Sequence, residues 1–344
     1  MRHKNMNKVF CVSVLLTAFL GCRTDQQSHA ARDVLTAKRP IIDMHLHAFT
    51  FKEFGTLPNG ENVPNPATGK PPEAKTDADI LRLTLEAMDR YNIRLGMLSG
   101  RLETVYAWKS AAPGRFLASA QFGGRPASDA TALDPTPSLD SLRREHAAGR
   151  LQALGEITSP YEGLAFDGPE LAPYFALAAE LKMPVGVHTG LTIPDAVHTI
   201  APRYRIELGN PVHLDEVLAR NAGLRLYLMH MGDIWQESTL AILHMYPQVN
   251  IDVATMDWGI PRAQFYGMLQ RLIAAGFAKR IMFGSDQMVW PEVIGPAIET
   301  IESAPFLTDE QKHDIFYNNA ARFLGLPELP VPTRPKHRGH SVTR

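Results

Sequence analysis

The chain has 344 residues, of which 45% are hydrophobic and 21% are charged, and its formal net charge is −1. These values are ordinary for a soluble globular enzyme, and the length allows one large domain or two. The near-neutral charge argues against a nucleic-acid binder, which normally carries a surplus of basic residues on one face.

Residues 1–22 are predicted to be an export signal. Residues 1–8 are basic, residues 9–20 form an apolar run too short to span a bilayer comfortably, and Gly21 and Cys22 follow. A small residue before a cysteine is typical of a bacterial lipoprotein signal, in which Cys22 is lipidated. Simple secretion is the alternative, because the two residues before Gly21 fit that signal poorly. We expect a periplasmic protein, or one held at the membrane only by a lipid on Cys22, with residues 23–38 as a polar tether.

From residue 39 to residue 326, short apolar runs alternate with helical patterns. Strands are predicted at residues 39–47, 93–98, 116–122, 151–157, 184–189, 224–230, 249–254 and 281–283. Helices are predicted at residues 76–91, 103–110, 139–148, 171–181, 214–219, 237–245, 262–275, 291–301 and 309–323. Two long loops occupy residues 48–75 and 190–211, and residues 327–344 form a proline-rich basic tail that we expect to be loose.

This alternation predicts a parallel sheet, and eight strand–helix units predict a closed (β/α)8 TIM barrel as a single domain over residues 39–326. The strands are continuous apolar runs, as expected for parallel strands that are covered on both faces. No Gly-x-Gly-x-x-Gly sequence opens a helix, so a dinucleotide-binding fold is not expected.

The first predicted strand carries two histidines one residue apart. Side chains of a strand alternate between its faces, so Asp43, His45 and His47 share one face, opposite Met44 and Leu46. Two imidazoles in this arrangement can bind one metal ion, and neutral imidazole suits zinc and related divalent ions.

Other metal-ligand side chains occur where later apolar runs stop. In a TIM barrel, active sites lie at the carboxyl ends of the strands. Each residue alone has an ordinary explanation, such as a hydrogen-bonded core histidine or a helix-capping aspartate. Burying all of them together would be costly without a divalent cation, so the sequence predicts a metal site. The additional candidate ligands are Glu156, His188, His230 and Asp286.

The order His-x-His, Glu, His, His, Asp on successive strands resembles the amidohydrolase superfamily. The surrounding segments are similar to amidohydrolase family 2, which includes hydrolases and the aminocarboxymuconate-semialdehyde decarboxylase group. The resemblance covers about residues 40–326, including residues 211–218 and the closing residues 318–325. It implies a metal-dependent enzyme in which His45, His47 and Asp286 bind a metal ion.

The resemblance leaves the number of ions open. In single-metal members His188 completes the ligand set, and His230 donates or accepts a proton beside the reacting centre. In two-metal members His188 and His230 bind a second ion, and an acid or carboxylated lysine on the fourth strand bridges both ions. Glu156 stands at that position and favours two ions; another possibility leaves it as an acid that binds no metal. Zinc is the default, although manganese, iron or nickel would suit the same ligands.

The predicted reaction is hydrolysis of an amide, lactone or ester in a small organic substrate. A bound metal makes hydroxide available at neutral pH by lowering the pKa of its water to about 7, and Asp286 would act as general acid–base. The alternative is non-oxidative decarboxylation or carbon–carbon cleavage of a small carboxylic acid, with His230 or Asp286 protonating the product. A non-catalytic binding lipoprotein is disfavoured because the ligand set is complete. Serine or cysteine catalysis is not expected, because no Gly-x-Ser-x-Gly occurs and both cysteines lie in the leader.

Substrate contacts are expected from the loops at the same rim. An arginine can bind a substrate carboxylate or phosphate, and an indole can stack on a flat substrate; the alternative is that most of these arginines are solvated surface charges. The candidates are Arg101, Arg125, Arg203, Arg205, Trp258 and Trp290. Asp43 and Asp252 are predicted to orient the imidazoles rather than bind the metal directly. The sequence does not indicate an oligomeric state.

Overall fold

The structure is a computed structural model that describes residues 39–53 and 60–331. These residues belong to the second of two units into which the chain divides, Thr36–Arg344. The predicted signal with Cys22, the predicted tether and residues 332–344 of the predicted tail lie outside the described residues.

Eight strands form one parallel sheet in which each strand pairs with the next along the chain. They are β1 (Ile41–His47), β2 (Ile93–Ser99), β3 (Phe116–Phe122), β4 (Ala153–Ile157), β5 (Val185–Val187), β6 (Leu226–Leu228), β7 (Val249–Asp252) and β8 (Ile281–Met282). Backbone hydrogen bonds from Met44 to Phe283 and from Asp286 to His45 connect the end of the sheet to β1. The sheet therefore curves into a barrel, and the predicted TIM-barrel fold is confirmed.

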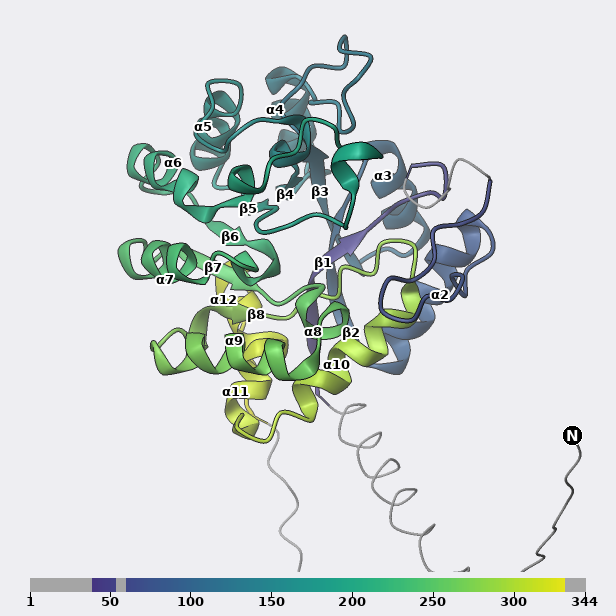
Figure 1. The fold of residues 1–344 in the computed structure, drawn as a ribbon, viewed down its shortest axis with the longest axis vertical. Helices are drawn as coiled ribbons and strands as arrows, with labels where there is room; N and C mark the ends of the chain where they lie inside the picture. The colour runs from purple at the N-terminus through teal and green to yellow at the C-terminus, as the bar shows by residue number, and fades with distance from the viewer. Residues whose placement is uncertain (1–38, 54–59, 332–344) are drawn as a thin grey trace, which may run out of the picture. The chain divides into compact units, whose positions relative to one another are not determined.

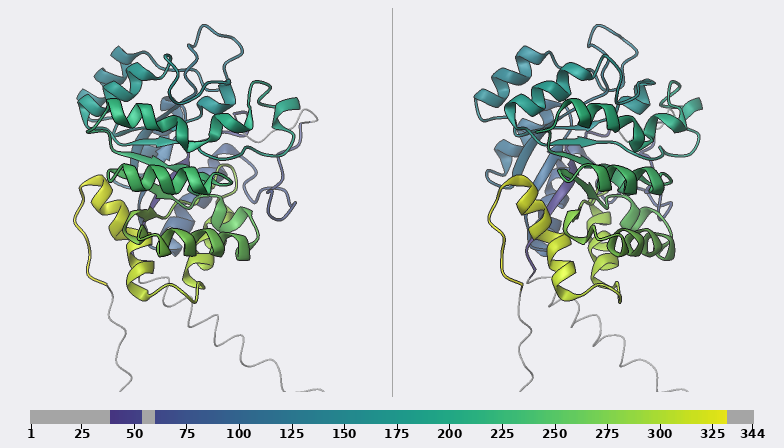
Figure 2. Two further views of the ribbon diagram at one scale, coloured as in Figure 1. Left: turned by 60° about the vertical axis from the view of Figure 1, so that its left-hand side comes forward. Right: turned by 90° about the vertical axis from the view of Figure 1, so that its left-hand side faces the viewer.

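Helices cover the outside of the barrel (Figures 1 and 2). They are α2 (Asp77–Arg90), α3 (Leu102–Ala111), α4 (Leu139–Ala147), α5 (Ala172–Leu181), α6 (Asp215–Arg220), α7 (Gln236–Met245), α8 (Met256–Gly259), α9 (Arg262–Ala274), α10 (Ile294–Glu302), α11 (Asp309–His313) and α12 (Asn319–Leu324). Every residue of β1 and β4 is buried, because the strands are covered on both faces. Among the described residues, none of the helices has the length and hydropathy that a membrane span requires.

The last four strands, β5 to β8, end earlier than their apolar sequences indicate, and the ends of β6 and β8 show how. The prediction extended the sixth strand to His230, but β6 stops at Leu228, and His230 and Met231 have left-handed backbones with φ of 62° and 57°. Left-handed residues cannot continue a strand, so the chain turns into a 3₁₀ segment, η5 (Met229–Gly232). In the same way β8 stops at Met282, and Asp286 follows in a left-handed conformation with φ of 49°. These turns direct both side chains into the barrel mouth.

The beginning of the predicted tail is held against the barrel domain. The carbonyl of Leu329 accepts hydrogen bonds from His313 Nε2 at 3.0 Å and from Asn318 Nδ2 at 3.1 Å. Arg322 forms an ion pair with Glu328 at 2.8 Å. The chain is therefore anchored for several residues beyond α12.

Candidate metal centre

Six side chains of metal-ligand type converge at the carboxyl ends of five strands. All of them are buried, with exposed fractions between 1% and 6%. Two come from β1, one from β4, and three follow the ends of β5, β6 and β8: His45, His47, Glu156, His188, His230 and Asp286. The structure thus brings together every residue that the sequence analysis proposed as a ligand.

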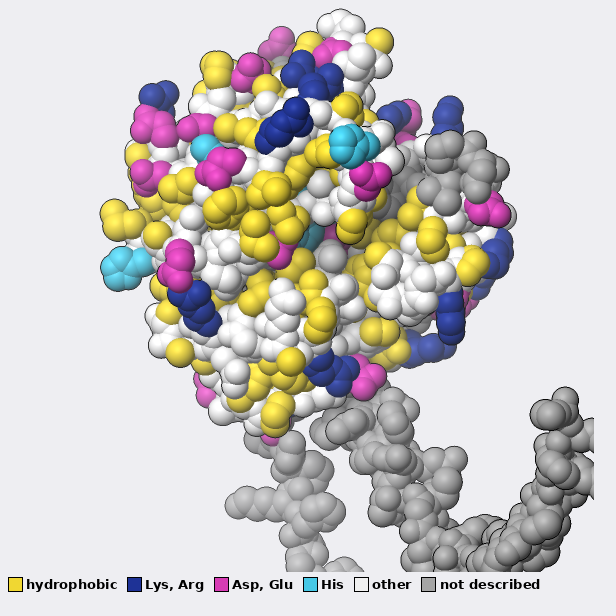
Figure 3. Space-filling model, viewed as in Figure 1, with side chains coloured by type: hydrophobic (Ala, Val, Ile, Leu, Met, Phe, Trp, Pro, Cys, Tyr) yellow, Lys and Arg dark blue, Asp and Glu magenta, His cyan; other side chains and the backbone are white. Residues whose placement is uncertain are grey.

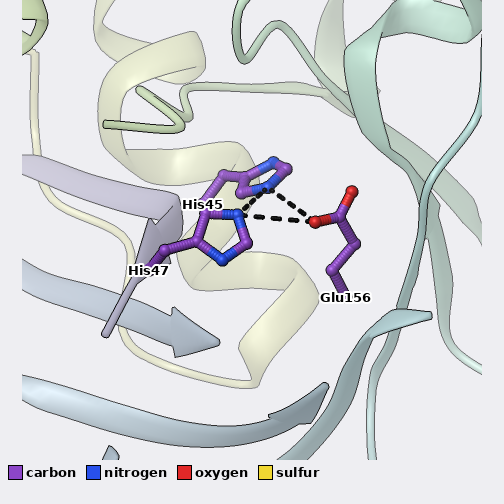
Figure 4. A group of neighbouring side chains, drawn as sticks. All are labelled: His45, His47 and Glu156. Atoms are coloured by element: carbon purple, nitrogen blue, oxygen red, sulfur yellow. Dashed lines mark hydrogen bonds and ion pairs between the residues drawn. The ribbon is translucent and has the colours of Figure 1, made fainter. Parts of the chain in front are cut away.

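The first group of ligand atoms surrounds the two histidines of β1. Their Nε2 atoms face each other at 3.1 Å, and Asp286 Oδ1 lies 3.0 Å from His47 Nε2 and 3.6 Å from His45 Nε2. Glu156 Oε2 lies 3.4 Å from His47 Nε2 and 3.8 Å from His45 Nε2 (Figure 4). Two ligands bound about 2.1 Å from one ion, at angles between about 90° and about 109°, lie about 3.0 to 3.4 Å apart. The separations of 3.0, 3.1 and 3.4 Å lie in this range, and the contacts of His45 with the two carboxylates, at 3.6 and 3.8 Å, are longer; His45, His47 and Glu156 form one group that could hold an ion.

A second group shares Glu156 with the first. Glu156 Oε1 lies 2.6 Å from His188 Nδ1 and 3.3 Å from His230 Nε2, and these two nitrogens are 3.1 Å apart. The carboxylate of Glu156 therefore faces a histidine pair with each of its oxygens. This arrangement can hold one ion in either group, or two ions bridged by Glu156.

In each of three imidazoles, a hydrogen-bond partner outside the centre fixes which ring nitrogen faces inward. Nδ1 of His230 donates to the carbonyl of Ala254 at 3.2 Å, and Nε2 of His188 donates to the carbonyl of Leu191 at 3.2 Å. With those nitrogens protonated, the other ring nitrogen of each neutral histidine presents a lone pair to the centre. His45 is held in the same way through its Nδ1 by Asp252.

Asp252 and Asp43 hold His45 and its neighbours in place. Asp252 Oδ2 accepts a hydrogen bond from His45 Nδ1 at 3.1 Å, while its Oδ1 accepts from the backbone nitrogens of His230 and Ala254. Asp43 Oδ1 accepts from the backbone nitrogen of His45 at 3.0 Å, and burial raises the pKa of Asp43 to about 7. Asp252 thus contacts an imidazole, whereas Asp43 contacts the backbone that carries it.

The centre pairs imidazoles with carboxylates. Burial alone would lower the pKa of His45, but Asp286 and Asp252 outweigh burial and raise the pKa well above its ordinary value. Burial would likewise raise the pKa of Glu156, but His188 and the other histidines hold that pKa well below the ordinary value. Protons on these rings occupy the lone pairs that a metal needs, so metal binding would release protons.

The sequence analysis missed Thr255 and the aromatic side chains beside the centre. Thr255 Oγ1 donates to Asp286 Oδ2 at 2.5 Å from a left-handed backbone with φ of 63°. Phe49 stacks on His47 with ring centroids 4.4 Å apart. Tyr161 meets His188 edge-on with centroids 4.8 Å apart. The alternation of apolar and polar residues gives no signal for contacts made by loop residues, so none of these could be read from it.

Among the predicted substrate contacts, the arginines already have partners. Arg203 Nη2 lies 2.5 Å from Glu162 Oε2, and Arg125 Nε donates to the carbonyl of Glu162 at 3.0 Å. Arg101 lies 3.3 Å from a carboxylate oxygen of Glu53, and Arg205 donates to backbone carbonyls of its own loop. Substrate binding by these arginines stays a prediction.

The two predicted stacking indoles pack against each other. The rings of Trp258 and Trp290 meet edge-on with centroids 6.4 Å apart, and both side chains are buried. Trp258 Nε1 donates to the carbonyl of Ser285 at 2.6 Å, and Trp290 Nε1 donates to that of Val63 at 3.1 Å. Both indoles therefore join loops at this rim, and their contact with a substrate stays a prediction.

Comparison with known proteins gives one family match. The family model described as Amidohydrolase matches residues 42–326. No curated protein matches this chain.

Several solved structures have the same fold. One is a probable 2-pyrone-4,6-dicarboxylic acid hydrolase from Acinetobacter baumannii, with a TM-score of 0.57 and 15% sequence identity. The match covers 83% of this chain and 99% of that chain. A 5-carboxyvanillate decarboxylase from Sphingomonas paucimobilis has a TM-score of 0.54 and 15% identity, with coverage of 84% and 100%. A dihydroxybenzoic acid decarboxylase from Polaromonas sp. JS666, with bound manganese and 2-nitroresorcinol, has a TM-score of 0.56 and 15% identity, with coverage of 84% and 97%. At these identities, the likeness shows the fold alone.

Proposed function

This chain belongs to the amidohydrolase family, and from that premise we propose that it is a metal-dependent hydrolase of a small organic amide, lactone or ester. Family membership and the converging ligand groups imply a divalent metal ion. When bound, such an ion polarises a carbonyl and lowers the pKa of its water. The observation that carries the proposal is the position of Glu156 between two histidine pairs.

We propose zinc as the metal and two ions as its stoichiometry. His45, His47 and Asp286 would hold the first ion, His188 and His230 the second, and the two oxygens of Glu156 would contact both. The fit is supported by the separations within each group and by the inward-facing lone pairs.

Asp286 is the proposed general acid–base. Although burial works against ionisation, His45 and His47 hold the pKa of Asp286 well below its ordinary value, so the group is a carboxylate at neutral pH. Its Oδ2 is oriented by Thr255, and its Oδ1 faces the centre. Asp286 would accept a proton from the attacking water and deliver it to the leaving group.

The second candidate is a metal-dependent carboxy-lyase, the activity named for two of the structures that share this fold. His230 supports it, because its Nε2 lies at the centre, 3.3 Å from Glu156 Oε1. From there, a protonated His230 could deliver its proton to a product carbanion. This reaction would require one ion and would release carbon dioxide.

The two functions are separated by the products formed in ¹⁸O-labelled water. The protein, loaded with zinc or manganese, is incubated with panels of amides, esters, lactones and aryl carboxylic acids, beside Asp286→Asn. The hydrolase is supported if ¹⁸O appears in a newly formed carboxylate with the unmodified protein but not with Asp286→Asn. The hydrolase proposal is contradicted if Asp286→Asn forms as much labelled carboxylate as the unmodified protein, or if carbon dioxide is the only product. Carbon dioxide that the unmodified protein releases and Asp286→Asn does not supports the lyase. No product from any compound would count against both.

We also propose that the protein is exported and anchored by a lipid on Cys22. The support is the basic start, the apolar run and the Gly21-Cys22 pair in the sequence. Mass spectrometry of the N-terminus from membrane fractions would find diacylglycerol on Cys22. An unmodified N-terminus within the polar segment would instead indicate simple secretion.

A further inference from the structure

Hydrophobic side chains are exposed on two adjoining loops where β5 and β6 end. Leu191 is 38% exposed, Ile193 42% and Ile234 52%, and we call these three residues the rim surface. Scattered apolar side chains are normal on a protein surface, but apolar side chains grouped beside a polar site are typical of ligand binding.

The two loops are locked together. Asp233 Oδ2 accepts a hydrogen bond from the backbone nitrogen of Leu191 at 3.0 Å. A Cβ atom at Gly190, where φ is 89°, would lie 2.3 Å from Asp233 Cβ, so only glycine allows this approach. Because Ile234 follows Asp233 directly, the close approach brings Ile234 and Leu191 into the same part of the rim.

The β5 loop is folded rather than loosely placed. Ala196, Ala201 and Tyr204 form a buried cluster of their own, with Tyr161 packed against it. The hydroxyl of Tyr204 donates to the carbonyl of Gly190 at 2.8 Å. The loop therefore has an apolar interior, and the exposure of Leu191 and Ile193 is a feature of its folded form.

The rim surface adjoins the metal centre directly. The carbonyl of Leu191 accepts a hydrogen bond from Nε2 of His188, whose other nitrogen faces Glu156. Tyr161 covers the edge of the same imidazole. Figure 3 shows hydrophobic side chains on this face around a recess in which histidine and acidic side chains are visible. A molecule reacting at the centre would thus lie beside the loop that carries Leu191 and Ile193.

The arginines of the neighbouring loops already have partners. Arg203 and Arg125 are paired with the buried carboxylate of Glu162, and Arg205 is turned to carbonyls of its own loop. Residues 54–59, which lie outside the described ranges, contain no lysine or arginine. The part of a ligand beyond the centre can therefore contact the exposed parts of the rim surface.

We infer that the substrate carries an alkyl, acyl or aryl group that packs on the rim surface beside its reacting carbonyl. This inference rests on the proposed function, because it assigns the non-reacting part of that substrate. Burying one methylene group of an acyl chain tightens binding by about fourfold. Affinity should therefore increase with chain length until the chain passes the rim surface.

The test measures binding rather than turnover. Calorimetry of the zinc-loaded protein with n-alkyl hydroxamic acids, from acetyl to octanoyl, gives Kd as a function of chain length. We expect Kd to fall by about threefold to fourfold per methylene in the unmodified protein. The double variant Leu191→Ser, Ile234→Ser should lose most of this dependence and keep its affinity for the acetyl compound. Both residues are exposed, and a thermal unfolding curve confirms that the variant is folded.

The matched control is Met245→Ser. Met245 is 65% exposed and ends α7, which begins near the rim and runs back along the barrel, so this variant should keep the full chain-length dependence. The inference is overturned if Kd is independent of chain length, or if the double variant and the control behave alike. It is also overturned if the rim surface is a dimer interface. In that case the unmodified protein and Met245→Ser would be dimers, and the double variant would be a monomer. Chain-length dependence without hydrolysis of any amide, lactone or ester would defeat the proposed function, and the rim surface would then bind the apolar part of a different ligand.

Discussion

Glu156 turns Oε1 to Nδ1 of His188 at 2.6 Å and points its second oxygen away from that ring. The second oxygen instead lies 3.4 Å from Nε2 of His47 on β1. One carboxylate thus connects ligand groups from opposite parts of the barrel. In the proposed two-ion site, Glu156 would be the residue that contacts both ions.

We predict that Glu156→Gln lowers the metal content from two ions per chain to one. The neutral amide keeps the shape of the side chain but removes the negative charge and replaces one oxygen by a poor ligand. Elemental analysis of the purified protein measures the ratio. Glu162→Gln, a second buried glutamate outside the centre, should leave the count unchanged. One ion in both the unmodified protein and Glu156→Gln would contradict the bridge.

Asp252→Asn should weaken metal binding by about 10-fold to 100-fold. Asp252 holds the ring of His45 so that its Nε2 presents a lone pair to the centre. The amide can turn its nitrogen toward His45 Nδ1 and then favours the wrong tautomer. Competition with a chelator measures the affinity. Asp257→Asn is the control, since Asp257 is also buried in this region but has no hydrogen-bond partner for its carboxylate among the described residues. Equal affinities for the two variants would rule out this role.

The pH dependence of stability should reveal Asp257. Burial, followed by repulsion from Asp43 and Asp252, raises the pKa of Asp257 well above its ordinary value. The native state therefore keeps a proton that the unfolded chain loses above about pH 4. Below about pH 4, the protonated Asp257 makes its full contribution to the free energy of unfolding. This contribution decreases by about 1.4 kcal/mol per pH unit as the pH rises toward the native pKa.

Asp257→Asn removes this dependence, so the variant should gain stability relative to the unmodified protein as the pH rises. Urea unfolding of both proteins in the presence of chelator, between about pH 4.5 and about pH 7.5, measures the difference in the free energy of unfolding. An exposed control, Asp195→Asn, should show no such trend. A constant difference between Asp257→Asn and the unmodified protein would mean that Asp257 is ionised in the fold.

The ligands could be predicted from the sequence because each stands at or just beyond the end of an apolar run. His188 and Asp286 are examples, since barrel topology alone brings the ends of β5 and β8 to one rim. Thr255 could not be predicted in the same way. Its contact with Asp286 depends on a left-handed backbone at a β-branched residue, a conformation that local preference strongly disfavours. The partner of Arg203 was equally hidden, because it depends on how three loops pack together.

Thr255→Val should reduce kcat by about 13-fold to 70-fold, because a hydrogen bond to a charged group contributes roughly 1.5 to 2.5 kcal/mol. Valine keeps the branched shape but cannot donate to Asp286 Oδ2. Steady-state kinetics with the substrate identified by the ¹⁸O assay measures kcat and KM separately. Thr255→Ser keeps the hydroxyl and should retain most activity. A fall in the valine variant that serine does not rescue would indicate a packing defect instead.

A buried carboxylate joins the loops that follow β3, β4 and β5. Glu162 is fully buried; its Oε1 accepts from the backbone nitrogens of Leu133 and Asp134, and its Oε2 pairs with Arg203. Glu162→Gln removes the charge and leaves Arg203 without its counterion. Since that arginine is about one-third exposed, the loss should be about 2 kcal/mol, below the roughly 3 to 5 kcal/mol of a fully buried pair.

A double-mutant cycle with Arg203→Met tests this account through the free energy of unfolding in urea. If the two side chains act as a pair, the double variant should be less destabilised than the sum of the single variants by about 1 kcal/mol or more. Additive losses would mean that Glu162 acts only through its backbone partners. In that case the substrate role predicted for Arg203 would be tested by kinetics: Arg203→Met would raise KM for an anionic substrate while Glu162→Gln would not.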